Sequence, residues 1–372
     1  MHYKLADVVT EIKEKEDHPS ESKYERFVGL EHYVSREIVI QNYGGTDILE
    51  STMKFFHSRD ILVARRNVYL KRASVAFFDG LTSGDSIVLR AKNERIGRLL
   101  PFVLNTDEFW DYADQYSDGT MSKRLSPKTL LEYEFDLPNE EDQDALADLL
   151  WAAVDTKYAY QKLLKQTDDL VKSQFIEMFG LPEKNDHGYD VGTVADVVQD
   201  IHYGTSAKAT DKGQYTYLRM NNITYDGQLD LSDIKYIDVP DKDLKGCLVQ
   251  RGDVLFNRTN SRELVGKTCA FMEAQPMIIA GYIIRLRMNG KVLPEYLSIF
   301  MNLKRSKNLL FSMAKGAVGQ ANINAQELQA IKMLVPPMSV QEQFTELVRQ
   351  SDKSKFDCSN RNLSRCSAPR NP

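Results

Sequence analysis

The chain of 372 residues contains a succession of short patterns that occurs twice in the same order. YERFVGLEHYVS in the first half matches YTYLRMNNITYDG in the second, with Phe27 aligned to Tyr217. Further along, FHSRDILVARRN matches VQRGDVLFNRTN, and GDSIVLR matches GYIIRLR. The offset between matched residues grows from 190 (Phe27 to Tyr217) to 198 (Pro138 to Pro336), always in the same order. Such internal repetition indicates tandem copies of one domain whose loops differ in length.

Each copy mixes strand and helix signals. Short β-branched or apolar runs predict strands, namely DILVA, SVAFF and SIVLR in the first copy and DVLFN, TCAFM and YIIRLR in the second. EYLSIFMNLKRSKNLLFSM follows Pro294 and has helical spacing. We therefore expect two tandem α+β domains, over 1–138 and 181–337. They are either a duplication without shared function or a duplicated binding module with two separate faces.

A long helix is predicted after the first copy, over 139–180, ending at Gly180 and Pro182. At 1.5 Å per residue, about 40 residues would span roughly 60 Å, which could hold two domains apart. Apolar and small residues recur at steps of three and four, which is typical of a coiled-coil seam. This predicted seam consists of Leu146, Leu149, Ala153, Thr156, Tyr160, Leu163, Thr167 and Leu170. The alternative is a core helix of a single domain.

A second helix is predicted after the second copy, over 338–356, and it is roughly half as long as the first. The remaining segment, 357–372, is polar, has lost the helical periodicity and ends in NP, so we expect it to be disordered. The predicted fold is thus two mixed α/β domains with two helices forming an antiparallel coiled coil, the second helix truncated.

The formal net charge of −5 does not by itself favour a nucleic-acid partner. The charge is segregated, however, because the run 139–148 is acidic and basic residues occur elsewhere in pairs. Local patches, and not the total, determine attraction to phosphates. No apolar stretch is long enough to span a bilayer and the N-terminus has no signal-peptide core, so we expect a cytoplasmic protein without membrane contact.

Sequence motifs for catalysis are missing. There is no GxxxxGK[ST] loop for ATP hydrolysis and no Asn/Asp-Pro-Pro-aromatic motif of amino-methyltransferases. The four cysteines lack metal-ligand spacing, and no histidine stands in a motif with a Ser or Cys nucleophile. We therefore expect no catalytic residue, no metal and no cofactor held by this chain.

Side chains suited to DNA follow a predicted strand in each copy. Arg can pair with guanine, Asn or Gln with adenine, and Lys or Arg with phosphate. The candidates in the first copy are Arg65, Arg66, Asn67, Lys71, Arg72, Lys123 and Arg124. Those in the second copy are Tyr203, Lys208, Asn257, Arg258, Thr259, Asn260, Arg262, Lys315 and Gln320. The alternative is a pair of surface loops whose Asn and Arg only form turns or pair with carboxylates.

Several of these patterns together resemble the specificity subunit of Type I restriction–modification systems over nearly the whole chain. The resemblance rests on FVGLEHY (27–33), SRDILVARRN (58–67), VKSQFIEMFG (171–180), DGQLDLSDIKYI (226–237), RGDVLFNRTNSRELVGKT (251–268) and PPMSVQEQF (336–344). RGDVLFNRTNS and the helix ending in SQFIEMFG are its most specific parts.

The resemblance implies two target-recognition domains, each reading one half of a split, asymmetric site in double-stranded DNA. The two helices would set the gap between the half-sites and dock two modification subunits, which methylate adenine with S-adenosylmethionine. A motor–nuclease subunit that uses ATP would join the assembled complex.

Two departures from the family stand out, namely the short second helix and the unusual tail. They predict weakened docking of one modification subunit or self-association. Two other functions remain open at this point. One is a stand-alone restriction enzyme or methylase, which the missing motifs disfavour. The other is a tandem-domain scaffold that binds protein, which the paired basic residues disfavour.

Overall fold

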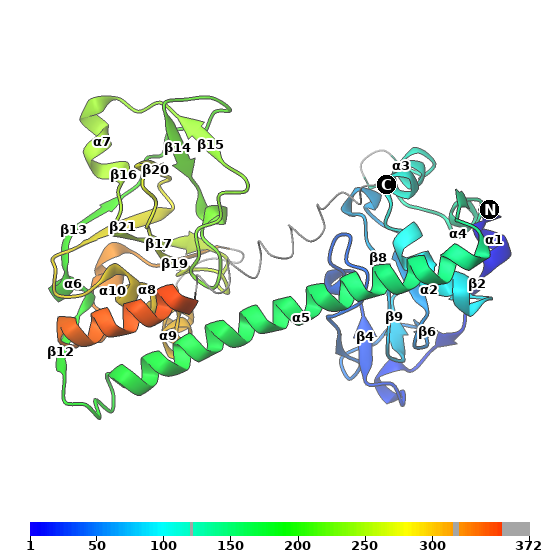
Figure 1. Cartoon of the computed structure of the whole chain (residues 1–372), viewed down its shortest axis with the longest axis horizontal. Helices are drawn as coiled ribbons and strands as arrows, with labels where there is room; N and C mark the ends of the chain where they lie inside the picture. Colours follow the sequence, from blue (N-terminus) through cyan, green and yellow to red (C-terminus); the bar gives the residue numbers. More distant parts are fainter. Residues whose placement is uncertain (120–121, 315–319, 352–372) are drawn as a thin grey trace. The chain divides into compact units, whose positions relative to one another are not determined.

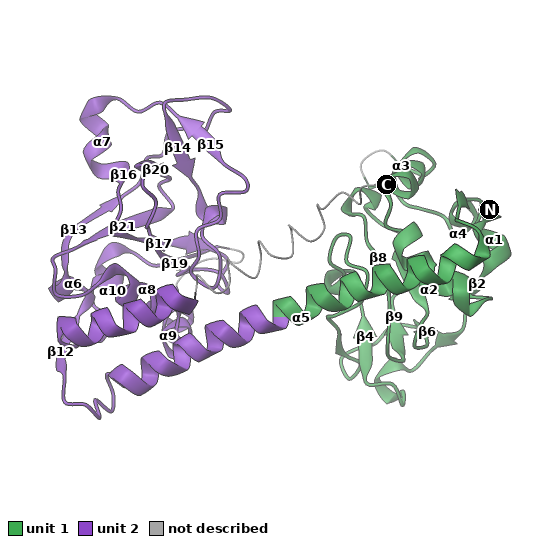
Figure 2. Cartoon of the chain, in the orientation of Figure 1, with its two compact units in different colours: residues 1–161 green, residues 162–372 purple. Residues whose placement is uncertain are grey.

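A computed structural model describes residues 1–119, 122–314 and 320–351 of the chain. The chain divides into two compact units, unit 1 over Met1–Gln161 and unit 2 over Lys162–Pro372 (Figure 2). The boundary falls inside one long helix, α5 (Glu140–Phe179), so each unit contains part of it. Among the described residues, no helix combines the length and the hydropathy required to cross a membrane.

Unit 1 contains two sheets. An antiparallel sheet has the strand order β2 (Val9–Ile12), β10 (Ser86–Ala91), β7 (Ile61–Ala64) and β8 (Ala73–Val75). The other has the order β3 (Lys15–Glu16), β6 (Met53–Phe56), β9 (Gly80–Thr82), β4 (Arg26–Val28) and β5 (Gly44–Gly45). A separate pair joins β1 (His2–Lys4) to β11 (Glu134–Asp136). The α-helices ahead of α5 are α1 (Leu5–Val8), α2 (Glu94–Val103), α3 (Asp107–Gln115) and α4 (Pro127–Leu131).

Unit 2 is built on the same plan. Its antiparallel sheet has the order β13 (Val198–Tyr203), β21 (Ile283–Met288), β17 (Asp253–Asn257) and β19 (Thr268–Ala270). The other sheet has the order β15 (Lys235–Ile237), β14 (Tyr215–Leu218), β20 (Met277–Ile279) and β16 (Leu248–Val249). Two short pairs join β12 (Asp190–Thr193) to β23 (Lys332–Val335) and β18 (Thr259–Asn260) to β22 (Ala321–Asn322). The helices are α6 (Val194–Val197), α7 (Asp241–Cys247), α8 (Pro294–Asn302), α9 (Lys304–Met313) and α10 (Ala325–Gln329).

Strand pairing confirms the duplication that the sequence predicts. The parallel pair β4–β9 in unit 1 places Phe27 opposite Leu81, and the parallel pair β14–β20 in unit 2 places Tyr217 opposite Ile278. Phe27 and Tyr217, aligned from the sequence alone, therefore occupy the same position in the two units. The α+β class predicted for each copy is also confirmed.

A buried aspartate marks a second shared position. Asp60 accepts hydrogen bonds from Nε and Nη2 of Arg90 at 2.8 and 2.7 Å. Asp253 accepts the same two bonds from Arg287 at 2.8 and 2.9 Å. Both carboxylates lie inside their units, and the ion pair raises the pKa of each arginine. The pair fixes the start of β7 or β17 against its neighbouring strand.

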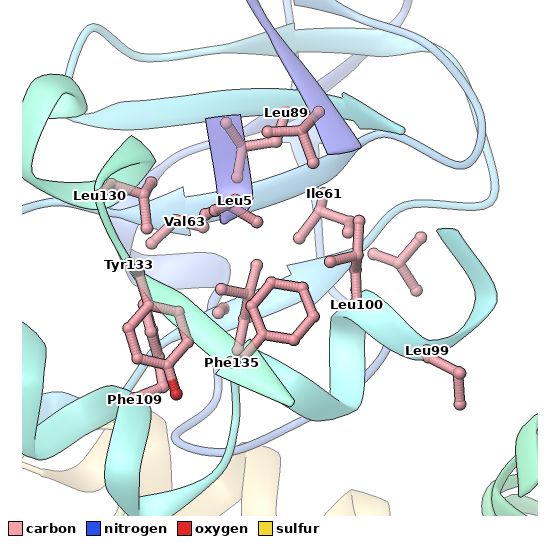
Figure 3. Close-up of a cluster of buried hydrophobic side chains, with 14 of the residues drawn as sticks. Leu5, Ile61, Val63, Leu89, Leu99, Leu100, Phe109, Leu130, Tyr133 and Phe135 are labelled. Atoms are coloured by element: carbon pink, nitrogen blue, oxygen red, sulfur yellow. The ribbon is translucent and has the colours of Figure 1, made fainter. Parts of the chain in front are cut away.

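The apolar core of unit 1 lies between the β2–β10–β7–β8 sheet and the helices α2, α3 and α4 (Figure 3). Ile61, Val63 and Leu89 contribute from the sheet, while Leu100 and Phe109 contribute from the helices. Unit 2 repeats this arrangement with Val254 and Ile284 from its sheet and Phe300 from α8. In both units the core thus packs on the sheet, and the candidate loops follow the ends of its strands.

Helix α5 forms where the sequence predicts it, but the predicted seam is not the face that packs on the units. The packed residues are Gln143, Ala147 and Val154 in unit 1 and Val171, Phe175 and Phe179 in unit 2. Seam residues Leu149, Leu163 and Leu170 are 68%, 49% and 57% exposed. The spacing of the predicted seam therefore does not coincide with the buried positions of α5.

The second helix is described over 338–351 and packs against the end of α5 within unit 2 (Figure 1). The Phe344 ring centroid lies 5.4 Å from that of Phe175 and 5.3 Å from that of Phe179. Val348 lines a cavity of about 140 Å³ together with Asp168 and Val171. Later residues of one helix thus lie near earlier residues of the other, so the two run antiparallel here. A coiled coil along the whole of α5 stays a prediction, and residues 352–356 and the predicted disordered tail 357–372 lie outside the described residues.

Candidate nucleic-acid interface

In unit 1, the structure brings together two segments that the sequence places more than 50 residues apart. The Arg65 N–H donates to the Asp85 carbonyl oxygen at 2.9 Å, and the Arg65 carbonyl oxygen accepts from the Leu125 N–H at 2.8 Å. The Asn67 N–H donates to the Lys123 carbonyl oxygen at 2.9 Å. These main-chain bonds join the loop after β7 to the segment 122–125, so the predicted cations of the first copy share one end of the sheet.

The backbone of this loop is left-handed at two of the predicted residues. Asn67 has φ 53° and Lys71 has φ 49°. Asparagine tolerates this conformation better than most residues because its short polar side chain hydrogen-bonds locally. Its Oδ1 accepts from Ser122 Oγ at 2.9 Å. Asn67 therefore shapes the loop as a turn residue, as the alternative interpretation of the sequence expected.

Four of the candidate cations of unit 1 are paired with carboxylates. Arg66 Nε lies 3.0 Å from Asp85 Oδ2, and Arg124 Nη2 donates to Asp85 Oδ1 at 2.8 Å. Lys71 pairs with Asp107 at 3.3 Å, and Lys123 donates to the Asp114 carboxylate at 2.6 Å. The surface at this end is thus a set of positioned ion pairs and not a field of free positive charge.

Arg65 and Arg72 serve mainly the local structure. Arg72 donates to the carbonyl oxygens of Leu30 and Arg66 at 3.0 and 2.9 Å. Arg65 Nε donates to the Leu125 carbonyl oxygen at 3.3 Å. Burial lowers the pKa of both guanidinium groups. Their side chains tie loops to the sheet.

Unit 2 forms the same main-chain bonds. The Arg258 N–H donates to the Tyr282 carbonyl oxygen at 2.9 Å, and the Arg258 carbonyl oxygen accepts from the Ile323 N–H at 2.9 Å. Thr259 and Asn260 then pair with Asn322 and Ala321 in the β18–β22 ladder. Arg258 therefore occupies the position of Arg65, as the sequence alignment predicts.

Two predicted DNA contacts of unit 2 lie inside the loop. Asn257 is fully buried, and its Oδ1 accepts from Asn260 Nδ2 at 3.2 Å. Thr259 is also buried and donates to Asn322 Oδ1 at 3.0 Å. Asn260 Oδ1 in turn accepts from the Ser261 N–H at 2.9 Å. These amides and hydroxyls hold the loop, so Asn257 and Thr259 are placed to position neighbours and not to touch a base.

The two candidate arginines of unit 2 lie over aromatic rings. The Arg258 guanidinium carbon is 4.8 Å from the centre of the Tyr203 ring, and Arg258 Nε is buried without a hydrogen-bond partner in the described part of the chain. The Arg262 guanidinium carbon is 4.3 Å from the centre of the Phe311 ring. Tyr203 Oη accepts from the Ala325 N–H at 3.0 Å, which fixes the first ring. Each ring holds its cation without neutralising it.

The remaining candidates are scattered or not described. Lys208 and Gln320 are exposed on separate loops of unit 2. Lys315 lies outside the described residues. Within 1–119, 122–314 and 320–351, no group of three or more His, Cys, Asp or Glu side chains is arranged to hold a metal ion. Cys269 is buried, which raises its thiol pKa to about 12.

Sequence reasoning missed Asp85, Tyr282 and Phe311. Asp85 follows Gly84 just before one matched strand, and Tyr282 follows Gly281 just before the other. Pairing these strands with the strands that precede the candidate loops would have placed both residues beside the loops. Phe311 carries no such signal, because its contact with Arg262 joins separate loop and helix segments.

Residues 188–364 match the family model of the Type I restriction modification DNA specificity domain. The matched residues make up a little under half of the chain, which is similar to Type I specificity subunits. It is 29% identical over 168 residues to the putative type I restriction enzyme MjaX specificity subunit of Methanocaldococcus jannaschii, covering 44% of this chain and 39% of that one. It is 28% identical over 159 residues to the EcoKI specificity subunit of Escherichia coli, covering 41% of this chain and 34% of that one. The alignments therefore span well under half of these relatives.

The fold agrees with that of a solved specificity subunit. The crystal structure of the Type I restriction–modification S subunit from M. genitalium matches over 98% of this chain and 92% of that chain, with a TM-score of 0.52. The sequence identity of 13% limits this likeness to the fold. The likeness extends to unit 1, which lies outside the residues matched by the family model.

Proposed function

We propose that this chain is a Type I specificity subunit, that it binds double-stranded DNA and that each unit reads one half of a bipartite, asymmetric site. The observation that carries the proposal is that the two units share the same main-chain hydrogen bonds in their candidate loops but have different side chains at the equivalent positions. The same main-chain bonds hold Arg65 in unit 1 and Arg258 in unit 2. Around them, unit 1 presents arginines and a carboxylate where unit 2 presents a threonine, an amide and a tyrosine.

Different functional groups on one framework are what two different half-sites require. Base edges in the major groove differ in their donors and acceptors, so a change of side chain at a fixed position changes the preferred base. A pure scaffold role would give no reason for cations and amides to occupy the same end of both sheets. Contacts to phosphates from the same loops would fix the register of the duplex.

We further propose that α5 docks modification subunits. Leu149, Leu163 and Leu170 lie on its exposed side, at multiples of seven residues, and are solvent-exposed in the chain by itself. Two modification subunits that methylate adenine with S-adenosylmethionine would cover this surface. A motor–nuclease subunit that uses ATP would join the complete assembly. In this proposal the chain itself supplies no catalytic residue and no cofactor, and it works in the cytoplasm.

Mapping methylated adenines across the genome of cells that carry this chain and its modification subunits tests the proposal. We expect one two-part motif with a fixed gap, which disappears when the gene for this chain is deleted. A purified chain that methylates or cleaves DNA by itself would instead establish a stand-alone enzyme. If the chain with its modification subunits binds no duplex in a mobility-shift assay, the scaffold alternative holds and the proposal fails.

The salt dependence of binding supplies a second test. Each phosphate contact releases counterions and contributes about −0.9 to the slope of log K against log salt concentration. We expect a steep slope for the complex of this chain with its modification subunits. A flat response between low and moderate salt would contradict DNA as the partner.

A further inference from the structure

Two guanidinium groups in unit 1 share a single carboxylate. Arg66 approaches Asp85 from the loop after β7, and Arg124 approaches it from the segment 122–125, at 3.0 and 2.8 Å. The carboxylate is 22% exposed, whereas the side chains of Arg66 and Arg124 are 50% and 43% exposed. The negative charge therefore lies beneath the two arginines, which face solvent.

The main chain holds both arginines firmly. Arg66 and Arg124 are partners in an antiparallel β-bridge. The Arg124 N–H donates to the Asp118 carbonyl oxygen at 2.8 Å, and the Asp118 N–H donates back to the Arg124 carbonyl oxygen at 3.0 Å. The Arg66 carbonyl oxygen accepts from Arg72 Nη2 at 2.9 Å. With backbone and carboxylate both fixed, each guanidinium loses less freedom on binding a ligand than a free arginine would.

The ion pairs are not required to close the loop. Unit 2 joins the equivalent segments through the same main-chain bonds, with Thr259, Tyr282 and Asn322 in place of Arg66, Asp85 and Arg124. Thr259 and Asn322 form one neutral hydrogen bond there, at 3.0 Å. The framework therefore folds without an Arg–Asp–Arg group, and the group in unit 1 needs another explanation.

The shared carboxylate favours a base over a phosphate as the ligand. A carboxylate within 3 Å of both guanidinium groups reduces their attraction for a phosphate, although the group keeps a net positive charge, and it fixes the direction of their remaining donors. The O6 and N7 atoms of guanine are neutral acceptors, and arginine is the side chain that most commonly pairs with them. Each guanidinium has five N–H donors, so donors remain after the contact with Asp85.

We infer that Arg66 and Arg124, oriented by Asp85, recognise guanine in the half-site bound by unit 1, and that unit 2 has no arginine reader at the equivalent position. The inference rests on the proposed DNA-reading function and names Arg66 and Arg124 as specificity-determining residues. Asp85 is a positioning residue that acts through them.

Selection from a random duplex library tests the inference, using the full chain purified with its modification subunits. Arg66→Lys and Arg124→Lys keep the positive charge but remove the planar fork that pairs with guanine. We expect the preference for guanine at one or two positions of one half-site to fall roughly 5- to 150-fold. The other half-site and the affinity for non-specific DNA stay unchanged. Arg98→Lys, which alters an arginine paired with Asp148 elsewhere in unit 1, serves as the matched control.

Asp85→Asn separates positioning from a structural role. Removing a negative charge beside the duplex leaves non-specific affinity equal or raises it, while the guanine preference falls because the arginines are no longer held. A parallel loss of specific affinity, non-specific affinity and thermal stability would show that Asp85 is structural and would overturn its assigned role.

Failure of the inference is distinguishable from failure of the proposed function. If the wild-type complex selects no sequence at all, the proposed function is wrong. If it selects a bipartite site without guanine in either half, or with a guanine preference that survives both lysine variants, the inference is wrong and the proposed function stands.

Discussion

The two units carry their candidate cations on one framework but treat the charges differently. Unit 1 pairs its outward cations with Asp85, Asp107 and Asp114. Unit 2 lays Arg258 and Arg262 over the rings of Tyr203 and Phe311. A carboxylate orients a cation but reduces its attraction for phosphate, whereas a ring orients it and leaves the charge available. Under the proposed function, unit 1 would therefore contribute more to base discrimination and unit 2 more to electrostatic affinity.

The largest expected effect tests whether the frameworks are equivalent. Asp60→Ala and Asp253→Ala each remove a buried carboxylate and leave its arginine unpaired, which costs roughly 3 kcal/mol of unfolding free energy. Arg90 is 41% exposed and Arg287 is 31% exposed, so the loss is smaller in unit 1. Hydrogen exchange resolved by peptide measures each unit separately. A loss confined to one of the two variants would contradict an equivalent framework.

The next effect tests the division of labour in affinity. Arg258→Ala combined with Arg262→Ala weakens DNA binding by the complex roughly 10- to 100-fold and reduces the magnitude of the salt slope by about two. Lys71→Ala combined with Lys123→Ala removes two cations that already have carboxylate partners, so the slope changes by less than one. Mobility-shift titrations at several salt concentrations measure both. Equal slopes of log K against log salt concentration for the two double variants would refute the proposed difference between the units in electrostatic affinity.

A smaller effect concerns the left-handed turn found in unit 1. Asn67→Ala lowers the free energy of unfolding by about 1 kcal/mol. At φ 53° the Cβ of an L-residue is strained, and alanine lacks the polar side chain whose local hydrogen bond offsets that strain. Asn67→Gly is close to neutral, since glycine adopts this conformation freely. Trp110 and Trp151, the two tryptophans of the chain, both lie in unit 1, so tryptophan fluorescence during denaturation follows this unit. An alanine variant as stable as the glycine variant would show that the turn carries no strain.

The smallest effect is a pH dependence specific to unit 2. Burial lowers the pKa of Lys307 to about 8, with Lys172 and Lys267 lowering it further and Asp226 acting in the opposite direction. Above pH 8 the folded unit has released this proton while the unfolded chain keeps it up to pH 10.5, so stability rises with pH in this window. We expect a gain of about 1 kcal/mol between pH 8 and 9.5. Lys307→Met removes the gain, whereas Lys304→Met on the same helix keeps it, as hydrogen exchange of unit 2 at both pH values would show.

The repeat made much of the fold predictable. Aligning Asp60 with Asp253 and Arg90 with Arg287 identified equivalent positions correctly, because the insertions fall in loops and leave strand register intact. Gly180, with φ 75°, ends α5 where the sequence predicts. The packed face of α5 could not be predicted from spacing. Leu146 packs against unit 1 and Leu149 is exposed, yet both fit the same pattern of apolar residues at steps of three and four.

The cations of the candidate site were predictable, but their partners were not. Arg66 and Arg124 stand in basic pairs that are visible in the sequence. Their partners lie in segments distant in the chain: Asp85 contacts Arg66 and Arg124, Asp107 contacts Lys71, and Tyr203 contacts Arg258. Only the folded sheet brings these segments together. For the same reason, the sequence could not tell that Asn257 and Thr259 are enclosed by their own loop.

The bonds that join Arg65 to Asp85 and Arg258 to Tyr282 use only main-chain atoms. Positions 85 and 282 supply only a carbonyl oxygen to these bonds, which every residue has, so their side chains can vary while the bonds are kept. Under the proposed function, a few point mutations at these positions would therefore change the DNA target while the main-chain framework is kept.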